Sequence, residues 1–294
     1  MLGFQYRTGF EPGLERMPQL YFDLKLGSMG MTLLSLALLA LPATYHRLVP
    51  RSRDPEAMRR VTSRSATAAL VPLALSVGLD VTVAAVAIAG TTLGWSVGGA
   101  AALLALLLWY GLRVGAATPA LPSAGRFAGI ALTPRTTVPN PLDQRIDRVL
   151  SEIRLVLPGT QALLGLQLSV ALMQGFGTLP APARLAYLIS LGLMALATIL
   201  LMTPAAFHRI VERGRSTDRF HRLAGAMLVA GMAVLALALS GDVYVAASRV
   251  ARFTDFASAL AAVTALFFYI LWFAVPLLRR RARADVEEPK LMRG

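Results

Sequence analysis

Seven apolar segments of about 20 residues divide the chain, and charged residues gather in short groups between them. A helix of about 20 residues spans roughly 30 Å, which is the thickness of the hydrocarbon core of a bilayer. We therefore expect an all-α fold, a polytopic transmembrane helix bundle with about seven spans. The expected spans are residues 24–45, 66–89, 95–112, 155–176, 184–207, 223–247 and 256–278.

Much of this pattern occurs twice, with a constant separation of 162 residues. Residues 42–47 (PATYHR) match residues 204–209 (PAAFHR), and Asp80-Val81 matches Asp242-Val243 in the same register. A register that holds without gaps over so long a span indicates a tandem duplication. The period is too long for a solenoid, so each copy is a unit of several helices.

The duplication divides the chain into four parts. Residues 1–114 form a first membrane repeat, 115–149 a linker rich in Pro and Ala, 150–281 a second repeat of four spans, and 282–294 a tail. Residue 1 aligns with residue 163, inside the first span of the second copy. The first repeat is thus expected to be truncated, with three full spans and a partial one. We expect a complete form with four spans in each repeat, translated from a start codon upstream of residue 1.

Composition and charge agree with a membrane protein. The chain is 56% hydrophobic, its mean hydropathy is +0.60, and both values exceed those of soluble globular proteins. The net charge is +13, and only two of the 29 basic residues, Lys25 and Lys290, are lysines. Because the arginines flank the spans, we expect them to contact anionic lipid headgroups, and we expect no binding of nucleic acid.

The placement of arginine predicts the orientation. If both His-Arg loops face the cytoplasm, the linker and the basic residues 279–283 also do, and the opposite loops carry few charges. Both copies then point the same way, as parallel repeats. The chain is thus expected to be a multi-pass plasma-membrane protein whose C-terminus is cytoplasmic.

The sequence shows few residues or motifs that are typical of an enzyme. It has no Cys, which excludes disulfides and thiolate chemistry, and its three His (His46, His208 and His221) fall in two separate loops. No nucleotide-binding loop, catalytic triad or metal-ligand spacing is present. We therefore expect a protein that is not an enzyme and that uses no cofactor or metal.

Three segments of the second copy carry a resemblance: residues 150–154 (LSEIR), 158–165 (PGTQALLG) and 204–209 (PAAFHR). With them the chain resembles a bacterial family of small four-helix membrane proteins of unknown function, over essentially all of residues 145–281. The resemblance implies a four-helix membrane unit in a bacterial inner membrane. Some members of that family carry a sodium:proton antiporter label. The first copy retains residues 2–5 (LGFQ) and PATYHR but lacks the lead-in.

Asp80 and Asp242 are the sharpest candidates for chemistry, because each lies inside an otherwise apolar span. A carboxylate within a bilayer is costly unless it is paired, protonated or hydrated, and ion-coupled antiporters need such a group. A structural role is the alternative. Each Asp lies about 24 to 30 Å beyond the cytoplasmic arginines, near the outer interface, where it can bond a helix end or Arg249.

Six residues form the cytoplasmic motif of the two copies: Pro42, His46, Arg47, Pro204, His208 and Arg209. Histidine titrates near neutral pH, which suits a pH sensor. Cations at a helix C-terminus also stabilise the helix dipole and bind lipid phosphates, without any special function. The prolines are expected to kink or end their helices.

Three glutamines, Gln5, Gln161 and Gln167, lie on membrane helices. Hydrogen bonding between helices is the ordinary role of such side chains, and lining a transport pathway is the alternative.

Two functions are compatible with these features. The first is a non-enzymatic structural or stress-related role in the membrane, and the alternative is a small secondary transporter that exchanges protons for a monovalent cation at Asp80 and Asp242. Convergence of the two carboxylates on one polar cavity would favour transport. The sequence leaves open the ion and whether copies of the chain form a homo-oligomer.

Overall fold

A computed structural model describes residues 3–5, 11–48, 55–111, 141–210, 217–250 and 254–278. All regular structure in these ranges is helical, and seven of the helices are long and apolar enough to cross a membrane. The predictions of an all-helical fold and of seven candidate spans are thus confirmed. The expected tail, residues 282–294, and most of the expected linker lie outside the described residues.

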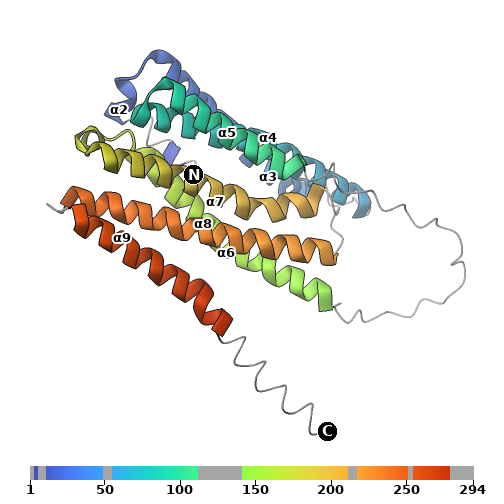
Figure 1. Ribbon diagram of the computed structural model, residues 1–294. Coiled ribbons are helices and arrows are strands. Elements are labelled where there is room, and N and C mark those ends of the chain that lie inside the picture. The colour runs from blue at the N-terminus through green and yellow to red at the C-terminus, as the bar shows by residue number, and fades with distance from the viewer. Residues whose placement is uncertain are drawn as a thin grey trace, which may run out of the picture.

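The helices of the two halves follow one another along the chain. Those of the first half are α2 (Pro12–Glu15), α3 (Gln19–Leu48), α4 (Pro55–Ala89) and α5 (Thr91–Tyr110). Those of the second half are α6 (Pro141–Val170), the short η2 (Gln174–Thr178), α7 (Ala181–Ile210), α8 (Asp218–Val250) and α9 (Thr254–Tyr269), which continues into the π-helical η3 (Ile270–Ala274). In Figure 1, α3, α4 and α5 lie at one side of the bundle and α9 lies at the opposite edge.

Most helices extend beyond the predicted spans, because polar residues at their ends continue the helix after the apolar pattern stops. α4 begins at Pro55, a residue suited to a first helical turn. α6 begins at Pro141, so residues 141–149, the end of the expected linker, are helical. α6 ends at Val170, earlier than predicted, and a 3₁₀ turn that contains two glycines follows it.

The core of the bundle joins the two halves through α4 and α7. Val77 and Val81 on α4 belong to the same buried cluster as Leu168 on α6 and Met194 on α7. The indole nitrogen of Trp109 on α5 also donates a hydrogen bond to the carbonyl of Ile199 on α7, at 3.3 Å. The two halves therefore share one core.

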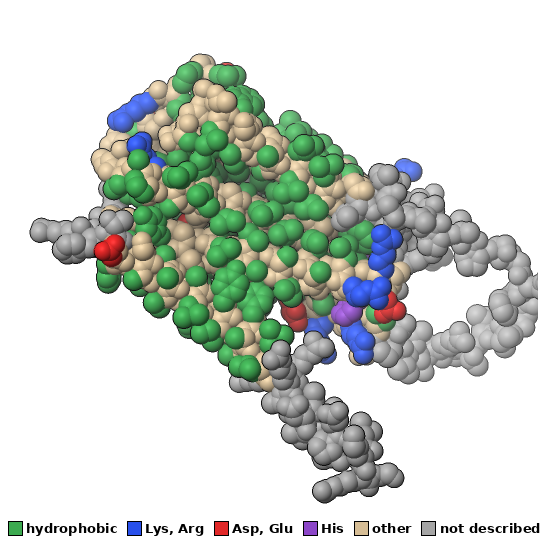
Figure 2. All heavy atoms as spheres, in the orientation of Figure 1, with side chains coloured by type: hydrophobic (Ala, Val, Ile, Leu, Met, Phe, Trp, Pro, Cys, Tyr) green, Lys and Arg blue, Asp and Glu red, His purple; other side chains and the backbone are tan. Residues whose placement is uncertain are grey.

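The surface is apolar between two polar ends. On the face that Figure 2 shows, charged side chains gather at the two ends of the bundle, and hydrophobic side chains cover most of the surface between them. Large hydrophobic side chains are exposed on α3, α5 and α9, among them Leu36, Leu103 and Phe267. Such a surface suits contact with lipid tails.

Glycines hold α5 against α4. A Cβ atom built on Gly98 would lie 1.9 Å from the Thr82 hydroxyl oxygen and 2.5 Å from the Gly78 carbonyl oxygen, so only glycine allows this approach. In the second half, the 162-residue register replaces Gly94 and Gly98 by Phe256 and Leu260. Phe256 and Leu260 are exposed, so the face of α9 that corresponds to the α5 glycines is not buried against α8.

Gly98→Ala is expected to destabilise the protein by about 1 to 3 kcal/mol, because the added methyl group overlaps atoms of α4. Thermal unfolding of the purified protein in detergent measures the loss. Gly99→Ala is the matched control, since a Cβ atom on Gly99 meets nothing within 4 Å. Equal stability of the two variants would contradict the glycine contact.

Candidate functional site

The carboxylate of Asp80 lies at the centre of a buried polar cluster in the first half. Asp80 is 1% exposed, and its Oδ1 atom accepts from Lys25 Nζ at 2.6 Å and from Ser28 Oγ at 2.7 Å. Its Oδ2 atom accepts from the side-chain amide of Gln5. Ser76 extends the cluster by accepting from the same amide at 3.0 Å. Charge and hydrogen bonds are therefore both satisfied at Asp80.

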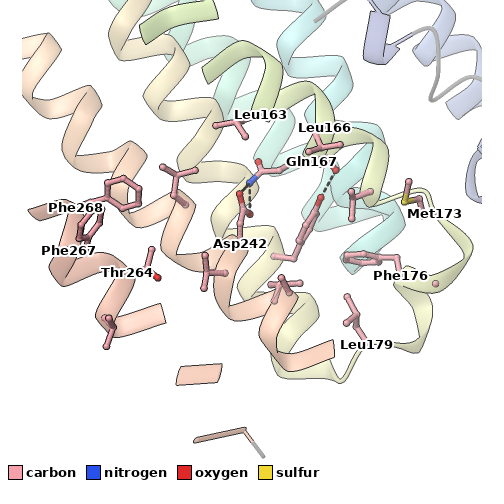
Figure 3. Close-up of a pocket in the computed structure, with 18 residues that line it drawn as sticks. Leu163, Leu166, Gln167, Met173, Phe176, Leu179, Asp242, Thr264, Phe267 and Phe268 are labelled. Carbon is pink, nitrogen blue, oxygen red and sulfur yellow. Dashed lines mark hydrogen bonds between the residues drawn. The ribbon is translucent and has the colours of Figure 1, made fainter. Parts of the chain in front are cut away.

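Asp242 lies at the centre of a second cluster, formed by α6, α7 and α8. The amide of Gln167 donates to both carboxylate oxygens, at 2.6 and 2.8 Å, and Ser190 Oγ donates to Oδ1 at 2.7 Å. Figure 3 shows the Gln167 amide directed at the Asp242 carboxylate. Asp242 is less buried than Asp80.

The two clusters repeat the same pattern of bonds. Gln and Asp are 75 residues apart in both halves, and Ser and Asp are 52 residues apart in both. Within the described part of the chain, neither carboxylate has a hydrogen-bond partner from the other half. The duplicated sequence thus builds one Gln-Ser-Asp frame in each half, and the two frames stay separate.

The cation is the difference between the two frames. Lys25 lies three residues before Ser28, and Tyr187 holds the corresponding position before Ser190. Tyr187 does not contact the carboxylate with its hydroxyl, which donates instead to the backbone carbonyl of Gln167 at 2.5 Å. Among the residues that the structure describes, no cationic side chain forms an ion pair with Asp242.

Asp242 lines a cavity of about 1080 Å³, and Asp80 does not. α6, η2, α7, α8 and α9 all contribute to its walls, which are apolar except for Gln167, Tyr187, Asp242 and Thr264. In Figure 3, Phe267 and Phe268 on α9 lie across from Gln167 and Asp242.

Gln167 keeps one unused hydrogen-bond acceptor beside the cavity. Its side chain is 5% exposed, and its Nε2 atom is engaged by Asp242 and Ser190. Its Oε1 atom is buried and has no hydrogen-bond partner among the described residues. A buried acceptor without a partner is costly, but this atom has no exposed surface, so a molecule in the cavity does not contact it in this conformation.

The Asp242 frame lies near one end of the bundle. Asp242 precedes the end of α8 at Val250 by eight residues, which corresponds to about 12 Å along the helix axis. Gln167 lies three residues before the end of α6 at Val170. The frame is therefore close to the end at which η2 connects α6 and α7.

The other predicted site residues lie away from this frame. The amide of Gln161 contacts the Met202 sulfur at 3.8 Å, and the ring of His208 lies 4.7 Å from the ring of Phe220. Pro204 lies inside α7, which continues to Ile210 and does not end at the proline. α3 likewise continues to Leu48, beyond Pro42. Four side chains of the motif lie outside the described residues: Pro42, His46, Arg47 and Arg209.

Sequence reasoning missed Lys25, Ser76 and Tyr187 as parts of the two frames. The signal was present, because the 162-residue register pairs Lys25 with Tyr187 and Ser28 with Ser190. The register does not show, however, which residues form hydrogen bonds with one another when they lie 20 to 75 positions apart in the chain. Arg249, the partner that the sequence suggested for an Asp, has a side chain outside the described residues.

No group of three His, Asp or Glu residues in the described ranges could hold a metal ion, so the frames themselves are the candidate sites.

Comparison with known proteins gives one match. No curated protein and no solved structure matches the chain. The model of one family matches residues 1–113 and 136–276, two segments that are consistent with a tandem arrangement. The chain therefore belongs to a family of unknown function, DUF6328.

Proposed function

We propose that the protein is a small secondary transporter of the bacterial plasma membrane, not an enzyme, that binds a monovalent cation at Asp242 in exchange for a proton. The observation that carries this proposal is the carboxylate of Asp242 at the wall of a large cavity, with no ion-pair partner among the described residues. The seven apolar helices support the membrane location.

Charge balance is the physical argument. Two neutral donors, the Gln167 amide and the Ser190 hydroxyl, contact Asp242, and they stabilise a negative charge without cancelling it. A carboxylate in an apolar bundle therefore favours either a proton or a bound cation. A group that takes the two in turn couples the movement of one to that of the other.

Asp80 has a structural role in this proposal. Its charge is already cancelled by Lys25, which is itself 5% exposed, so neither group is free to take part in exchange. We had expected the two carboxylates to act as a pair. The separate frames support instead a division of labour, in which the first half stabilises the bundle and the second half binds the ion.

The proposal includes the membrane orientation that the sequence predicts. The His-Arg loops and the C-terminus face the cytoplasm, and the arginines there contact anionic lipid headgroups. The Asp242 frame, at the opposite ends of α6 and α8, then opens toward the outer side of the membrane.

Asp242→Asn is expected to abolish cation-dependent proton flux in proteoliposomes, because the amide cannot exchange a proton for a cation. The frame should still fold, since the asparagine oxygen can replace Oδ1, which accepts from both Gln167 and Ser190, and only the second bond from Gln167 is lost. A pH-sensitive dye inside the vesicles measures the flux when sodium or an organic ammonium salt is added outside.

Asp255→Asn is the matched control for this experiment. It removes an exposed carboxylate from the first turn of α9, outside the cavity walls, and should leave the flux unchanged. Flux that persists in a folded Asp242→Asn protein would overturn the proposal. So would a wild-type flux no higher than that of empty vesicles with every cation, a result that would favour a structural role.

Lys25→Met is expected to destabilise the protein by about 3 to 5 kcal/mol, because it leaves the Asp80 charge buried without compensation. Addition of Asp80→Asn should restore most of that loss, since the double variant has no charge to bury. Denaturant unfolding of the purified proteins measures both changes. A single variant as stable as the wild type would contradict the structural role of the pair.

A further inference from the structure

We propose that the cation bound at Asp242 is an apolar primary ammonium, with its charged group at the place that corresponds to Lys25 Nζ in the first half. This inference rests on the proposed function and names the class of ligand. It starts from the comparison of two frames whose bonds match and whose cations differ.

The first half shows how such a frame holds an ammonium group. The side chain of Lys25 is a four-carbon chain that ends in an ammonium, and the ammonium lies 2.6 Å from Asp80 Oδ1. Ser28 and Gln5 donate to the same carboxylate and hold it in place. Lys25 is thus a tethered alkylammonium in a site built from Gln, Ser and Asp.

The second half has the same frame without the tether. Tyr187 occupies the position of Lys25, and its ring packs against the ring of Phe176 at 5.0 Å, edge to face. Its hydroxyl donates to the Gln167 carbonyl and not to the carboxylate. The place of the ammonium is therefore not taken by the residue that holds it in the first half, and Asp242 faces a cavity.

The polar groups of the cavity suit a donor of several hydrogen bonds better than a bare metal ion. Hard metal ions need a shell of oxygen ligands. Here the Thr264 hydroxyl is engaged by the Leu260 carbonyl, and the carboxylate already accepts three bonds. An ammonium carries three N–H donors and balances its charge with a single carboxylate, as Lys25 does at Asp80.

The apolar walls define the rest of the ligand. A cavity of about 1080 Å³ is far larger than an ammonium group, and Leu163, Val263, Phe267 and Phe268 are among its walls. Apolar surface gains affinity from every buried methylene. Aromatic rings also attract a cation through their faces. The ligand class is therefore a primary amine, protonated at neutral pH, with an apolar body longer than the lysine side chain.

The test measures binding of n-butyl-, n-hexyl- and n-octylammonium to the full chain in nanodiscs by calorimetry, with empty nanodiscs subtracted. Affinity should rise about fourfold for each added methylene, and Asp242→Asn should weaken binding on the order of a hundredfold. Tetramethylammonium, which has no N–H donor, and hexanol, which has no charge, should bind far more weakly than hexylammonium.

A variant of Tyr187 tests the assigned position directly. Tyr187→Lys places a tethered ammonium where Lys25 lies in the first half, so it should pair with Asp242 and block hexylammonium binding. Asp255→Asn, which changes an exposed carboxylate outside the cavity walls, is the control and should keep binding within a few-fold of the wild type. Should Tyr187→Lys fail to fold, the comparison of Asp242→Asn with Asp255→Asn still decides.

The possible outcomes separate this inference from the proposed function. Loss of hexylammonium binding in Asp242→Asn and in folded Tyr187→Lys supports the inference. Binding that is absent, or equal in the wild type and Asp242→Asn, overturns it. If sodium nevertheless drives an Asp242-dependent proton flux, the transporter proposal stands with a metal ion as substrate. If binding is absent and no cation drives such a flux, both proposals fail. Asp242-dependent binding without flux supports the ammonium site and overturns the transporter proposal.

Discussion

The cost of a charge inside an apolar helix bundle is the constraint on which the rest of this structure depends. Each half of the chain buries one carboxylate and surrounds it with the same two donors, a glutamine amide and a serine hydroxyl. Those donors orient the carboxylate and lower its cost, but they cannot cancel its charge. The first half cancels it with Lys25, and the second half leaves that position to a tyrosine. The exchange of Lys25 for Tyr187 therefore separates a carboxylate that has an internal cation from one that has none among the described residues.

The position of α9 favours the same half. The places of the α5 glycines are taken on α9 by Phe256 and Leu260, and both side chains are exposed. α9 lies at the edge of the bundle, and a cavity separates part of it from α6 and α8. The half in which no lysine pairs with the carboxylate is thus also the half with a cavity beside the carboxylate. These two observations together are the strongest reason to propose the binding site in the second half.

The shared core explains how the two halves can differ without loss of the fold. α4 and α7 are largely buried, and they hold residues of both halves in one cluster. The side chains of α9 contribute little to the buried core. A helix with few buried contacts tolerates bulky substitutions and movement better than a central helix does. The two halves can therefore differ at α9 while they share the buried core of α4, α6, α7 and α8.

The sequence by itself determined the class of fold, the seven apolar helices and the matching positions of Asp80 and Asp242 in the two repeats. Apolar length and a constant register are properties of the chain alone. It also placed Gln5 and Gln167 at matching positions, but not in contact with the carboxylates. Only the tertiary structure decided which side chains meet. The partners of Asp80 lie on segments up to 75 residues away, and helix packing alone determines which faces approach. The same reason applies to the cavity, since its walls come from α6, η2, α7, α8 and α9, and the sequence does not show that these elements meet.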